Sequence, residues 1–318
     1  MGARVKVLFR FDGARWLSEH VRTFAADGLD VSLCSEQEEG AYRDLLPESD
    51  VLWHILRPVT AGAIASAPRL KLIQKIGVGV NTIDLDAARA RGIAVCNMPG
   101  TNSRAVAEQT LLLMLACLRK LVAFDGVTRR GDGWSWPMEW QSGLGEIAGR
   151  TIGIVGFGAV PRLLASVLTA MGANVVYTGR TRYEDVHYPY LTKDELLARA
   201  DILSLHMPLD GTTRAWLDRA SLAAMKPGSI VINVARGPLI DETALHDALA
   251  AGHIGAAGLD VFEAEPALAD NPLFTLDNVV VSPHIAWLTR ETFERSLGVA
   301  VENCRRLRSG EPLLHRVA

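Results

Sequence analysis

The sequence is poor in cysteine and has no large excess of charge of one sign. Its four cysteines are scattered along 318 residues and form no Cys-x-x-Cys pair. That spacing disfavours a disulfide framework or a zinc site and is typical of reduced thiols. The histidines show no metal-ligand spacing either, so we predict no metal. The net charge of −3 gives no reason to expect nucleic acid or an anionic membrane surface as a partner.

Long apolar runs are missing as well. The longest purely apolar run, residues 111–118, is far shorter than the roughly 20 residues that span a bilayer. The N-terminus leads directly into a strand pattern at residues 5–9, whereas a signal peptide has a basic stretch before an apolar core. We therefore expect a soluble, cytoplasmic protein with no membrane partner.

Short apolar runs alternate with stretches of helical spacing along nearly the whole chain. The alternation is typical of parallel sheets joined by right-handed crossovers, and 318 residues are too many for one ordinary core. The predicted strands are residues 5–9, 31–34, 51–55, 72–76, 151–155, 174–178, 202–205, 230–233, 255–259 and 279–281. The clearest predicted helices are residues 13–26, 84–91, 103–121 and 289–308. We therefore predict an α/β protein with two domains, each containing a parallel sheet.

A glycine-rich turn joins the first strand of the second series to a helix. Gly156 permits a tight turn, and Gly158 lets the backbone approach a pyrophosphate because it has no Cβ. The N–H groups that open the helix, at Ala159 and Val160, would face the phosphates. The next position of this dinucleotide-binding pattern is Pro161, which suits a first helical turn but lacks the close contact that glycine allows. Since similar turns often bind no ligand, the loop alone leaves dinucleotide binding open.

The second strand of this unit lacks the usual acid at its end. NAD-binding units commonly place there a carboxylate that accepts hydrogen bonds from the ribose 2′-hydroxyl. Here Gly179 takes that place, and Arg180 and Arg182 follow it. Without the carboxylate a 2′-phosphate is not repelled, and an arginine can pair with it bidentately. We predict a preference for NADP(H), with NAD(H) as the alternative cofactor, unless the two arginines only form a solvated loop end.

Three short segments that follow later strands contain chemically active residues. They are Ala-Arg-Gly at 235–237, Asp-Val-Phe-Glu-Ala-Glu-Pro at 260–266 and Pro-His at 283–284. With the glycine loop and Gly-Val-Gly-Val-Asn at 77–81, they closely resemble the motifs of the D-isomer-specific 2-hydroxyacid dehydrogenase family. The resemblance covers nearly the whole chain, in order and in spacing. It implies hydride transfer between a nicotinamide cofactor and the 2-position of a small 2-oxo or D-2-hydroxy acid.

The resemblance implies Arg236, Glu265 and His284 as the catalytic set. Reduction of an oxo acid needs a proton donor at the carbonyl oxygen, and histidine titrates near neutral pH. A carboxylate such as that of Glu265 on the other ring nitrogen favours the imidazolium and fixes the ring. Arg236 can hold the substrate carboxylate and polarise its carbonyl. Each residue alone is more often a loop, turn or surface residue, and only their joint occurrence after strands of one domain favours catalysis.

The resemblance also assigns residues that bind the substrate and the cofactor. Backbone N–H groups of Val78 and Gly79 would grip the substrate carboxylate, with Arg57 on a nearby loop. Asn81 and Gln109 stand where Asp and His are common, and we expect neither change to affect the chemistry. The residues that match cofactor contacts, near the adenosine ribose and then near the nicotinamide, are Met207, Val234, Ala235 and Asp260.

The residues after the histidine bear on substrate size. The His-Ile-Ala-Trp stretch at 284–287 and the Tyr-Thr-Gly-Arg stretch at 177–180 resemble glyoxylate and hydroxypyruvate reductases of this family. Trp287 would cap the pocket and favour short substrates, and its indole N–H would bond a substrate hydroxyl. Alternatively, Trp287 only packs at the hinge between the domains. A phosphoglycerate dehydrogenase-like enzyme and a non-catalytic nucleotide-sensing protein of the same fold remain as alternatives.

We expect two Rossmann-like domains with an active-site cleft between them. The substrate domain would be discontinuous, residues 1–99 plus 288–318, and the dinucleotide-binding domain would be residues 100–287. The resemblance implies a homodimer joined through the cofactor domains, with helix 103–121 and the Trp-rich segment after it at the interface. The tryptophans that suit such a contact, unless they pack within one chain, are Trp134, Trp136 and Trp140.

Overall fold

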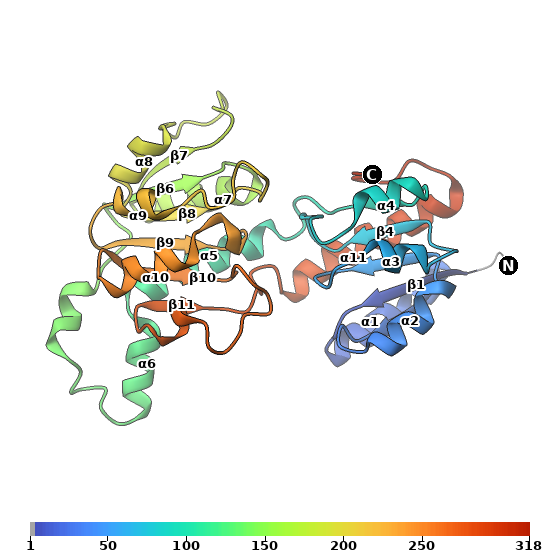
Figure 1. Cartoon of the computed structure of the whole chain (residues 1–318), viewed down its shortest axis with the longest axis horizontal. Helices are drawn as coiled ribbons and strands as arrows, with labels where there is room; N and C mark the ends of the chain where they lie inside the picture. The colour runs from blue at the N-terminus through green and yellow to red at the C-terminus, as the bar shows by residue number, and fades with distance from the viewer. Residues whose placement is uncertain (1–3) are drawn as a thin grey trace. The chain divides into compact units, whose positions relative to one another are not determined.

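The computed structural model describes residues 4–318 and divides the chain into two compact units (Figure 1). The units are Met1–Asn102 with Thr289–Ala318, here unit 1, and Ser103–Leu288, here unit 2. The sequence places the two boundaries after residues 99 and 287, whereas the units change after residues 102 and 288. Each change falls where a helix begins, because Ser103 starts one helix and Thr289 caps another.

Unit 1 contains a five-stranded parallel sheet in the order β2-β1-β3-β4-β5. Its strands are β1 (Val5–Arg10), β2 (Leu29–Cys34), β3 (Val51–His54), β4 (Leu72–Lys75) and β5 (Ala94–Cys96). The sequence predicts the first four strands to within two residues at either end. It does not predict β5, whose three buried residues are too short a run to show a period.

Helices flank this sheet, and short 3₁₀ turns continue two of them. They are α1 (Arg15–Thr23), η1 (Phe24–Asp27), α2 (Glu39–Leu45), η2 (Leu46–Glu48), α3 (Ala61–Ala65), α4 (Leu85–Ala90) and α11 (Arg290–Ser309). Side-chain caps fix three of the starts, including that of α3, where the Thr60 hydroxyl accepts a hydrogen bond from the N–H of Ala63. Asp84 accepts a hydrogen bond from the N–H of Ala87, and Thr289 accepts one from Thr292.

Unit 2 contains a six-stranded parallel sheet in the order β11-β10-β9-β8-β6-β7. Its strands are β6 (Thr151–Val155), β7 (Asn174–Thr178), β8 (Ile202–Leu205), β9 (Ser229–Asn233), β10 (Ile254–Leu259) and β11 (Val279–Val281). The chain places β7 on one side of β6 and all later strands on the other. Strand order therefore reverses between β6 and β8, and open α/β sheets bind ligands at the carboxyl ends of the strands at such a reversal.

Of the helices of unit 2, the sequence predicts the bounds of the first and the start of the one after the glycine loop. They are α5 (Ser103–Leu118), α6 (Leu121–Arg129), η3 (Met138–Gly143), α7 (Ala159–Ala170), α8 (Lys193–Arg199), α9 (Arg219–Ala223), η4 (Gly237–Leu239), α10 (Glu242–Ala250) and η5 (Pro272–Thr275). The predicted helix at 103–121 ends at Leu118. Lys120 takes a left-handed backbone conformation, with φ of 48°, and a separate helix starts after it.

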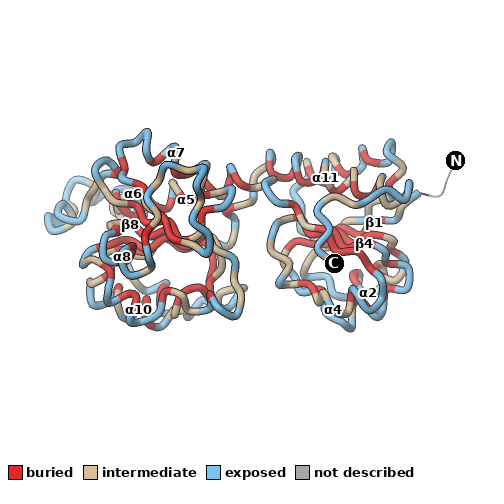
Figure 2. The backbone as a smooth tube through the Cα atoms, turned by 90° about the horizontal axis from the view of Figure 1, so that it is seen from above, coloured by how far each residue is buried: buried red, intermediate tan, exposed pale blue. Residues whose placement is uncertain are grey.

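Each sheet lies at the centre of the core of its unit, and helices and loops contribute the other buried apolar residues. β3, β4, β8 and β9 are buried along their whole length, and Figure 2 shows the sheets in the colour of buried residues. Parallel sheets with helices on both faces bury both sides of each strand, which explains why the sequence shows continuous apolar runs there. No helix of residues 4–318 is long and apolar enough to cross a membrane.

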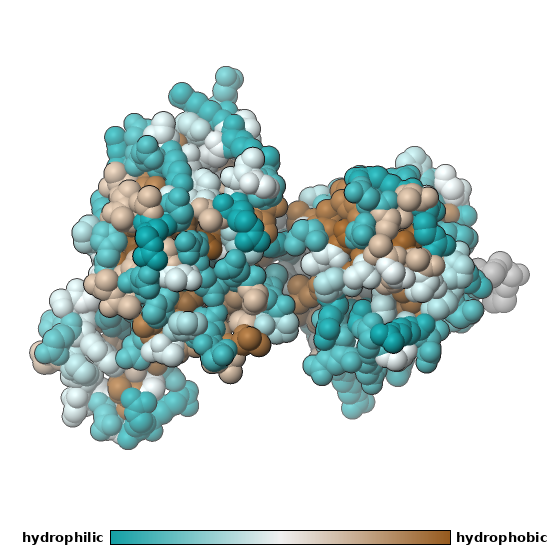
Figure 3. Space-filling model, viewed as in Figure 1, coloured by the Kyte–Doolittle hydropathy of each residue, from teal (hydrophilic) through white to brown (hydrophobic). Residues whose placement is uncertain are grey.

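Exposed apolar side chains lie on α5, α6 and α7, and α5 packs against both other helices. Figure 3 shows brown, apolar atoms over the α6 region on an otherwise mostly hydrophilic face. Trp136 and Trp140 pack edge-on against Phe124, with ring centroids 5.4 and 5.1 Å away, whereas 89% of the Trp134 surface is exposed. Two of the three tryptophans thus pack within one chain. The exposed side chains on these helices and the segment after α6 are Leu112, Leu121, Val122, Trp134, Met138, Leu163 and Val167.

Candidate active site

The glycine loop between β6 and α7 lies at the reversal of strand order in unit 2. Gly156 has φ of +83°, and a Cβ on it would lie 3.1 Å from backbone atoms of His206 and Met207, which follow β8. Only glycine suits this position. A Cβ on Gly158 would meet no atom within 4 Å, so the space in front of the α7 N-terminus is open. Such an opening fits a pyrophosphate, which the helix N–H groups would bind.

The first turn of α7 accommodates its proline. Pro161 is the third residue of the helix and is buried, while Ala159 is exposed and Val160 is half-buried. A proline in the first turn removes only an N–H that has no partner within the helix. The N–H groups before it belong to the two residues that the sequence assigns to the cofactor.

Gly179 follows β7 and faces the glycine loop. A Cβ on Gly179 would lie 3.7 Å from the Cα of Gly156, which is an ordinary van der Waals distance. A Cβ is therefore tolerated here, so packing around this atom does not require glycine. The hydroxyl of Tyr190 donates to the Gly179 carbonyl over 2.9 Å and steadies the start of the loop.

The two arginines of this loop, Arg180 and Arg182, are accessible to a ligand. The nearby Arg162 on α7 is not. The side chain of Arg180 is 77% exposed and its nearest charge is Asp210, 3.7 Å away, while Arg182 is exposed. Arg162 on α7 instead forms a two-pronged ion pair with Asp185, at 2.8 and 3.2 Å. A long, exposed ion pair such as that of Arg180 is weak and is readily exchanged for a phosphate.

The segment after β9 turns sharply and places Arg236. The side chain of Asn233 bridges the turn, donating to the Arg236 carbonyl at 2.8 Å and accepting from the Ala235 N–H at 3.0 Å. Gly237 follows, and a Cβ on it would overlap the carbonyl atoms of Phe262. No side chain fits there, so the Ala-Arg-Gly motif is a requirement of packing as well as of chemistry.

Arg236 is half-buried, and its guanidinium donates to the Ala235 carbonyl over 2.6 Å. Burial lowers the pKa of Arg236, and the negative charge of Glu265 opposes that effect. A guanidinium remains charged at any ordinary pH, so the group offers fixed donors for a carboxylate and a carbonyl oxygen.

Glu265 and His284 form a short ion pair. Nδ1 of His284 lies 2.6 Å from Oε2 of Glu265, whose other oxygen accepts from the Phe262 N–H at 3.1 Å. Burial raises the pKa of Glu265, but the hydrogen bond and charge of His284, the Phe262 N–H and the charge of Arg236 together lower it. The carboxylate is therefore ionised at neutral pH, and Nε2 is the ring nitrogen left to exchange a proton with a ligand.

A buried aspartate holds the segment after β11 that bears the histidine. His284 has a left-handed backbone, with φ of +56°, and its N–H donates to the Asp260 carbonyl at 2.7 Å. The Asp260 carboxylate accepts from the N–H groups of Ile285 and Ala286 at 3.0 and 2.8 Å. Asp260 is 0% exposed. Asp260 was predicted to contact the nicotinamide, but its side chain has no exposed surface for such a contact. It holds the segment that bears the histidine instead.

Two further side chains join this arrangement. Gln109 on α5 donates to the Ser282 hydroxyl at 3.1 Å, and that hydroxyl donates to Asp260 at 2.5 Å. Gln109 is thereby linked through Ser282 to the aspartate that holds the histidine segment. Ser282 was not singled out from the sequence, because its partner on α5 is 173 residues away and only the fold brings them together.

Trp287 is half-buried, and its indole N–H donates to the His284 carbonyl at 3.0 Å. The predicted bond from that N–H to a substrate hydroxyl is therefore not available in this conformation. The contact anchors the ring to the histidine segment. Among the remaining residues assigned to the cofactor, Met207 adjoins Gly156 and Val234 precedes the arginine turn.

The residues assigned to the substrate in unit 1 follow the carboxyl ends of β3 and β4. The N–H of Arg57 donates to a Glu36 oxygen at 3.2 Å, and the Arg57 side chain is exposed. Val78 is 46% exposed, and its carbonyl accepts from Asn97 at 2.9 Å, next to Gly79. Glu36 was not predicted from the sequence, since an acid in a polar loop carries no local signal.

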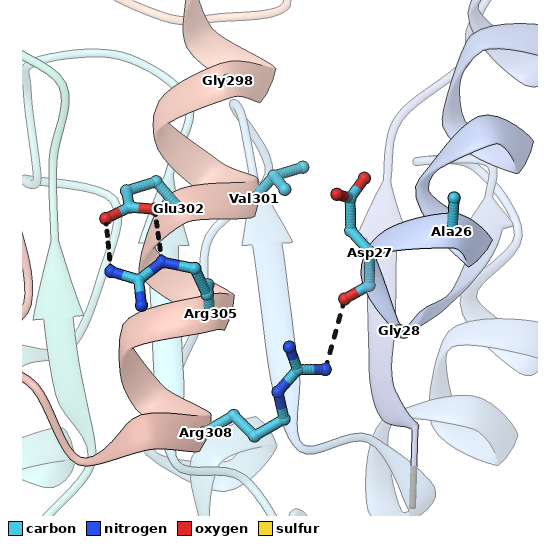
Figure 4. A pocket seen from close by; sticks show the side chains of 8 residues that line it. All are labelled: Ala26, Asp27, Gly28, Gly298, Val301, Glu302, Arg305 and Arg308. Atoms are coloured by element: carbon cyan, nitrogen blue, oxygen red, sulfur yellow. Dashed lines mark hydrogen bonds and ion pairs between the residues drawn. The ribbon is translucent and has the colours of Figure 1, made fainter. Parts of the chain in front are cut away.

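A groove of about 500 Å³ lies elsewhere in unit 1, between η1 and α11 (Figure 4). Arg305 in this groove is paired with Glu302 and Glu311, and Arg308 donates to the Asp27 carbonyl. None of the predicted site residues lines it. Within residues 4–318, no group of three or more His, Cys, Asp or Glu side chains is placed to hold a metal ion.

Comparisons with known proteins agree with this geometry. A sequence model described as "D-isomer specific 2-hydroxyacid dehydrogenase, NAD binding domain" matches residues 111–286. The chain is 42% identical to D-3-phosphoglycerate dehydrogenase of Mycobacterium tuberculosis strain H37Rv, over 86% of this chain and 52% of that protein. It is 36% identical to glyoxylate reductase of Aeropyrum pernix, over 86% of this chain and 85% of that protein.

A crystal structure of a Thermus thermophilus protein superposes with a TM-score of 0.90 and 36% identity, covering 99% of this chain and 100% of the other. The chain spans about half the length of the phosphoglycerate dehydrogenases that it matches. The match to the NAD-binding domain falls within unit 2, which holds the glycine loop, the arginine turn and the Glu265–His284 pair. This chain belongs to the D-isomer specific 2-hydroxyacid dehydrogenase family.

Proposed function

We propose that this chain is an NAD(P)-dependent D-2-hydroxyacid dehydrogenase in which His284 is the acid and base. The observation that carries the proposal is the 2.6 Å contact between His284 and Glu265, within electrostatic reach of Arg236. All three side chains come from segments at the carboxyl ends of strands in the NAD-binding unit. Such a constellation has the donors, the acid and the orienting carboxylate that oxo-acid reduction requires.

The residues present fit a nicotinamide cofactor, because the glycine loop leaves room for a pyrophosphate at the α7 N-terminus. When bound, the cofactor supplies the hydride that reduces C2 of the oxo acid. Arg236 holds the substrate carboxylate and polarises the C2 carbonyl. His284 gives its Nε2 proton to the carbonyl oxygen, and Glu265 stabilises the imidazolium before transfer. In the oxidative direction the neutral imidazole accepts the hydroxyl proton.

The preferred cofactor in this proposal is NADP(H), with NAD(H) as the alternative. The end of β7 carries no acid at Gly179, although a Cβ is tolerated there. Arg180 and Arg182 are exposed at the same place, and Arg180 has only a long ion pair to exchange. A 2′-phosphate would therefore gain a cationic partner and meet no carboxylate on β7.

The proposed substrates are small 2-oxo acids, glyoxylate and hydroxypyruvate above all. The indole N–H of Trp287 is bonded to the His284 carbonyl. This attachment of the ring to the histidine segment supports the proposal that Trp287 limits the volume for a substrate side chain. In unit 1, Val78 and Gly79 N–H groups and the exposed Arg57 are proposed to bind the substrate carboxylate. A phosphoglycerate dehydrogenase-like activity is the second candidate, favoured by the 42% identity to that enzyme.

Steady-state oxidation of NADPH and NADH tests the proposal directly. The panel contains glyoxylate, hydroxypyruvate, phosphohydroxypyruvate, phenylpyruvate and a branched 2-oxo acid. We expect the highest kcat/KM with glyoxylate or hydroxypyruvate and NADPH, and a narrower gap to phenylpyruvate in Trp287→Ala. Preference for phosphohydroxypyruvate would establish the second candidate. Absence of turnover with every pair would instead favour a non-catalytic nucleotide-sensing protein of this fold.

A further inference from the structure

We infer that Gln109 on α5 is a positioning residue that sets the catalytic histidine through Ser282 and Asp260. This inference rests on the proposed role of His284 as acid and base. The three side chains form one continuous chain of hydrogen bonds, at 3.1 Å from Gln109 to Ser282 and 2.5 Å from Ser282 to Asp260. Asp260 in turn binds the backbone on which His284 stands.

The direction of each hydrogen bond in this chain follows from the donors available. The Asp260 carboxylate accepts backbone N–H groups from Ile285 and Ala286 on its two oxygens, so it acts as an acceptor on both sides. The short contact with Ser282 then requires the serine to donate its single proton to Asp260. The serine oxygen has only lone pairs left for Gln109. The amide nitrogen of Gln109 must therefore face Ser282, and the amide thereby fixes which way the hydroxyl points.

The orientation of that hydroxyl affects the geometry at His284. A non-glycine residue in a left-handed conformation persists only when its surroundings hold it there. Here the hold is Asp260, which accepts the N–H of His284 on its carbonyl and the next two N–H groups on its carboxylate. Burial raises the pKa of Asp260, and the Ser282 hydrogen bond opposes this. If the hydroxyl turns away, a buried carboxylate loses a donor and the histidine segment loses part of its anchor.

Gln109→Glu is the variant that tests this series of hydrogen bonds, because the glutamate side chain has nearly the same shape as the native glutamine. When ionised, the introduced carboxylate has no proton to donate and attracts the Ser282 hydroxyl away from Asp260. When protonated, it donates as the amide does. We expect the ratio of variant to wild-type kcat to fall by about ten- to a hundredfold at neutral pH, the range for a lost hydrogen bond to a charged group. The ratio should recover as the pH is lowered and the new carboxyl takes up its proton.

Other titratable groups near Gln109, Ser282 and Asp260 can also change their protonation over that pH range. On the β10 and histidine segments they are Asp260, Glu265 and His284, and Arg236 follows β9. On α5 itself Glu108 is exposed, next to Gln109. All of these groups are present in the wild type too, so taking the ratio of kcat values at each pH isolates the new carboxyl.

Two control variants separate positioning from simple damage. Gln109→Met removes the donor without adding a titratable group, and its kcat ratio should be low at every pH. Gln37→Glu makes the same charge change at an exposed site of unit 1 and should match the wild type throughout. In Gln109→Glu the KM for the cofactor should change by less than about twofold, because the chain contacts the histidine segment and not the glycine loop. A low ratio without recovery in acid would overturn the inference, as would wild-type kcat in Gln109→Met.

Thermal unfolding without substrate gives a second readout that does not depend on turnover. The like charge of Asp260 and partial burial raise the pKa of a carboxyl at position 109 above its unfolded value. A carboxyl with a raised folded pKa destabilises the fold as the pH rises through the unfolded value toward the folded one. The Tm of Gln109→Glu should therefore equal that of the wild type in acid and fall below it toward neutral pH. Parallel curves of Tm against pH for Gln109→Glu and the wild type would overturn the proposed series of hydrogen bonds. If the Tm curves diverge as expected but the protein reduces no oxo acid, only the proposed function is refuted.

Discussion

At the scale of single residues, the geometry favours the ionised form of Glu265 beside His284. The carboxylate has a lowered pKa because the histidine, a backbone N–H and Arg236 outweigh its burial. The ionised carboxylate of Glu265 binds Nδ1, so Nε2 faces away from that hydrogen bond. The carboxylate also holds the ring in place while the proton is transferred. The same arrangement orients histidines in other acid–base enzymes, where loss of the orienting acid lowers turnover strongly.

The pH dependence of stability tests the charge of Glu265. Its folded pKa is lowered, so the stabilisation it provides is complete above the unfolded value of about 4.3 and is lost as the pH falls through the folded value. The Tm of Glu265→Gln should lie below that of the wild type at neutral pH, and the gap should close in acid. Glu263→Gln, an exposed site two residues away, serves as the control and should show no such closing. A gap that stays constant from neutral to acidic pH contradicts the assignment.

Residue-scale prediction from the sequence succeeded where a motif names a side chain and failed where only the fold supplies a partner. The resemblance to the family's motifs implied the arginine, glutamate and histidine, and the structure shows the expected contact between Glu265 and His284. The hydrogen bond of Gln109 to Ser282 was not predicted, because the two residues lie 173 positions apart in the sequence. The indole N–H of Trp287 was assigned to a substrate, whereas it bonds its own segment.

At the scale of the elements, the turn after β9 and the segment after β10 approach each other too closely for any side chain between them. Gly237→Ala would force a Cβ into the Phe262 carbonyl, which is backbone and cannot turn aside. We expect a loss of about 2 kcal/mol or more in unfolding free energy, as for overpacked sites. Gly298→Ala on α11 meets no atom within 4 Å and should instead be neutral or stabilising. Chemical denaturation of both variants provides the comparison, and an unaffected Gly237→Ala would refute this contact.

The loop after β7 determines cofactor choice in the proposed function. Gly179→Asp with Arg180→Ala supplies the missing acid and removes one cation, and a Cβ at position 179 makes only ordinary van der Waals contacts. The ratio of kcat/KM for NADPH to that for NADH should fall by about tenfold or more. The two substitutions replace the attraction between Arg180 and the 2′-phosphate by repulsion from the new carboxylate. Gly179→Ala alone is the matched control and should leave the ratio nearly unchanged. A wild-type protein that already prefers NADH would refute the reading of this loop.

Element boundaries were predictable where apolar runs were long and failed where backbone conformation decided. Strands β6, β7, β8 and β11 were predicted with the bounds that the structure shows. β5 was not predicted because it has only three residues. The end of α5 was predicted three residues late, since the left-handed turn at Lys120 interrupts an apolar pattern that continues into α6.

At the scale of the whole molecule, the exposed apolar side chains on α5, α6 and α7 bear on assembly. We propose that they form the interface of a homodimer joined through unit 2. Leu121 and Val122 are 52% and 60% exposed at the start of α6. Leu121→Asp with Val122→Asp should convert the dimer to monomers in sedimentation equilibrium, because charges on a buried apolar interface are costly. Leu268→Asp, a 70% exposed site elsewhere in unit 2, should leave the dimer intact. A wild type that sediments as a monomer contradicts the interface.

The overall organisation of the chain was predictable because two levels of pattern agree. Strand–helix alternation predicted two parallel α/β sheets, and the motif order assigned cofactor binding to the unit that matches the family's NAD-binding domain. Substrate choice was not predictable to the same depth. The determinants proposed for it, at Trp287, Arg57 and Val78, depend on packing that motifs do not encode.

The central claim, that His284 transfers the proton in a reduction at C2, is tested most directly by deuteride transfer. Glyoxylate is incubated with 4-deuterated NADPH and the product is analysed for deuterium at C2, in the wild type and in His284→Ala. We predict deuterated glycolate from the wild type, and a rate lower by about two to four powers of ten in His284→Ala with cofactor affinity preserved. His246→Ala, a histidine on α10 outside the site, should behave as the wild type. Near-normal deuteride transfer by His284→Ala would contradict the account.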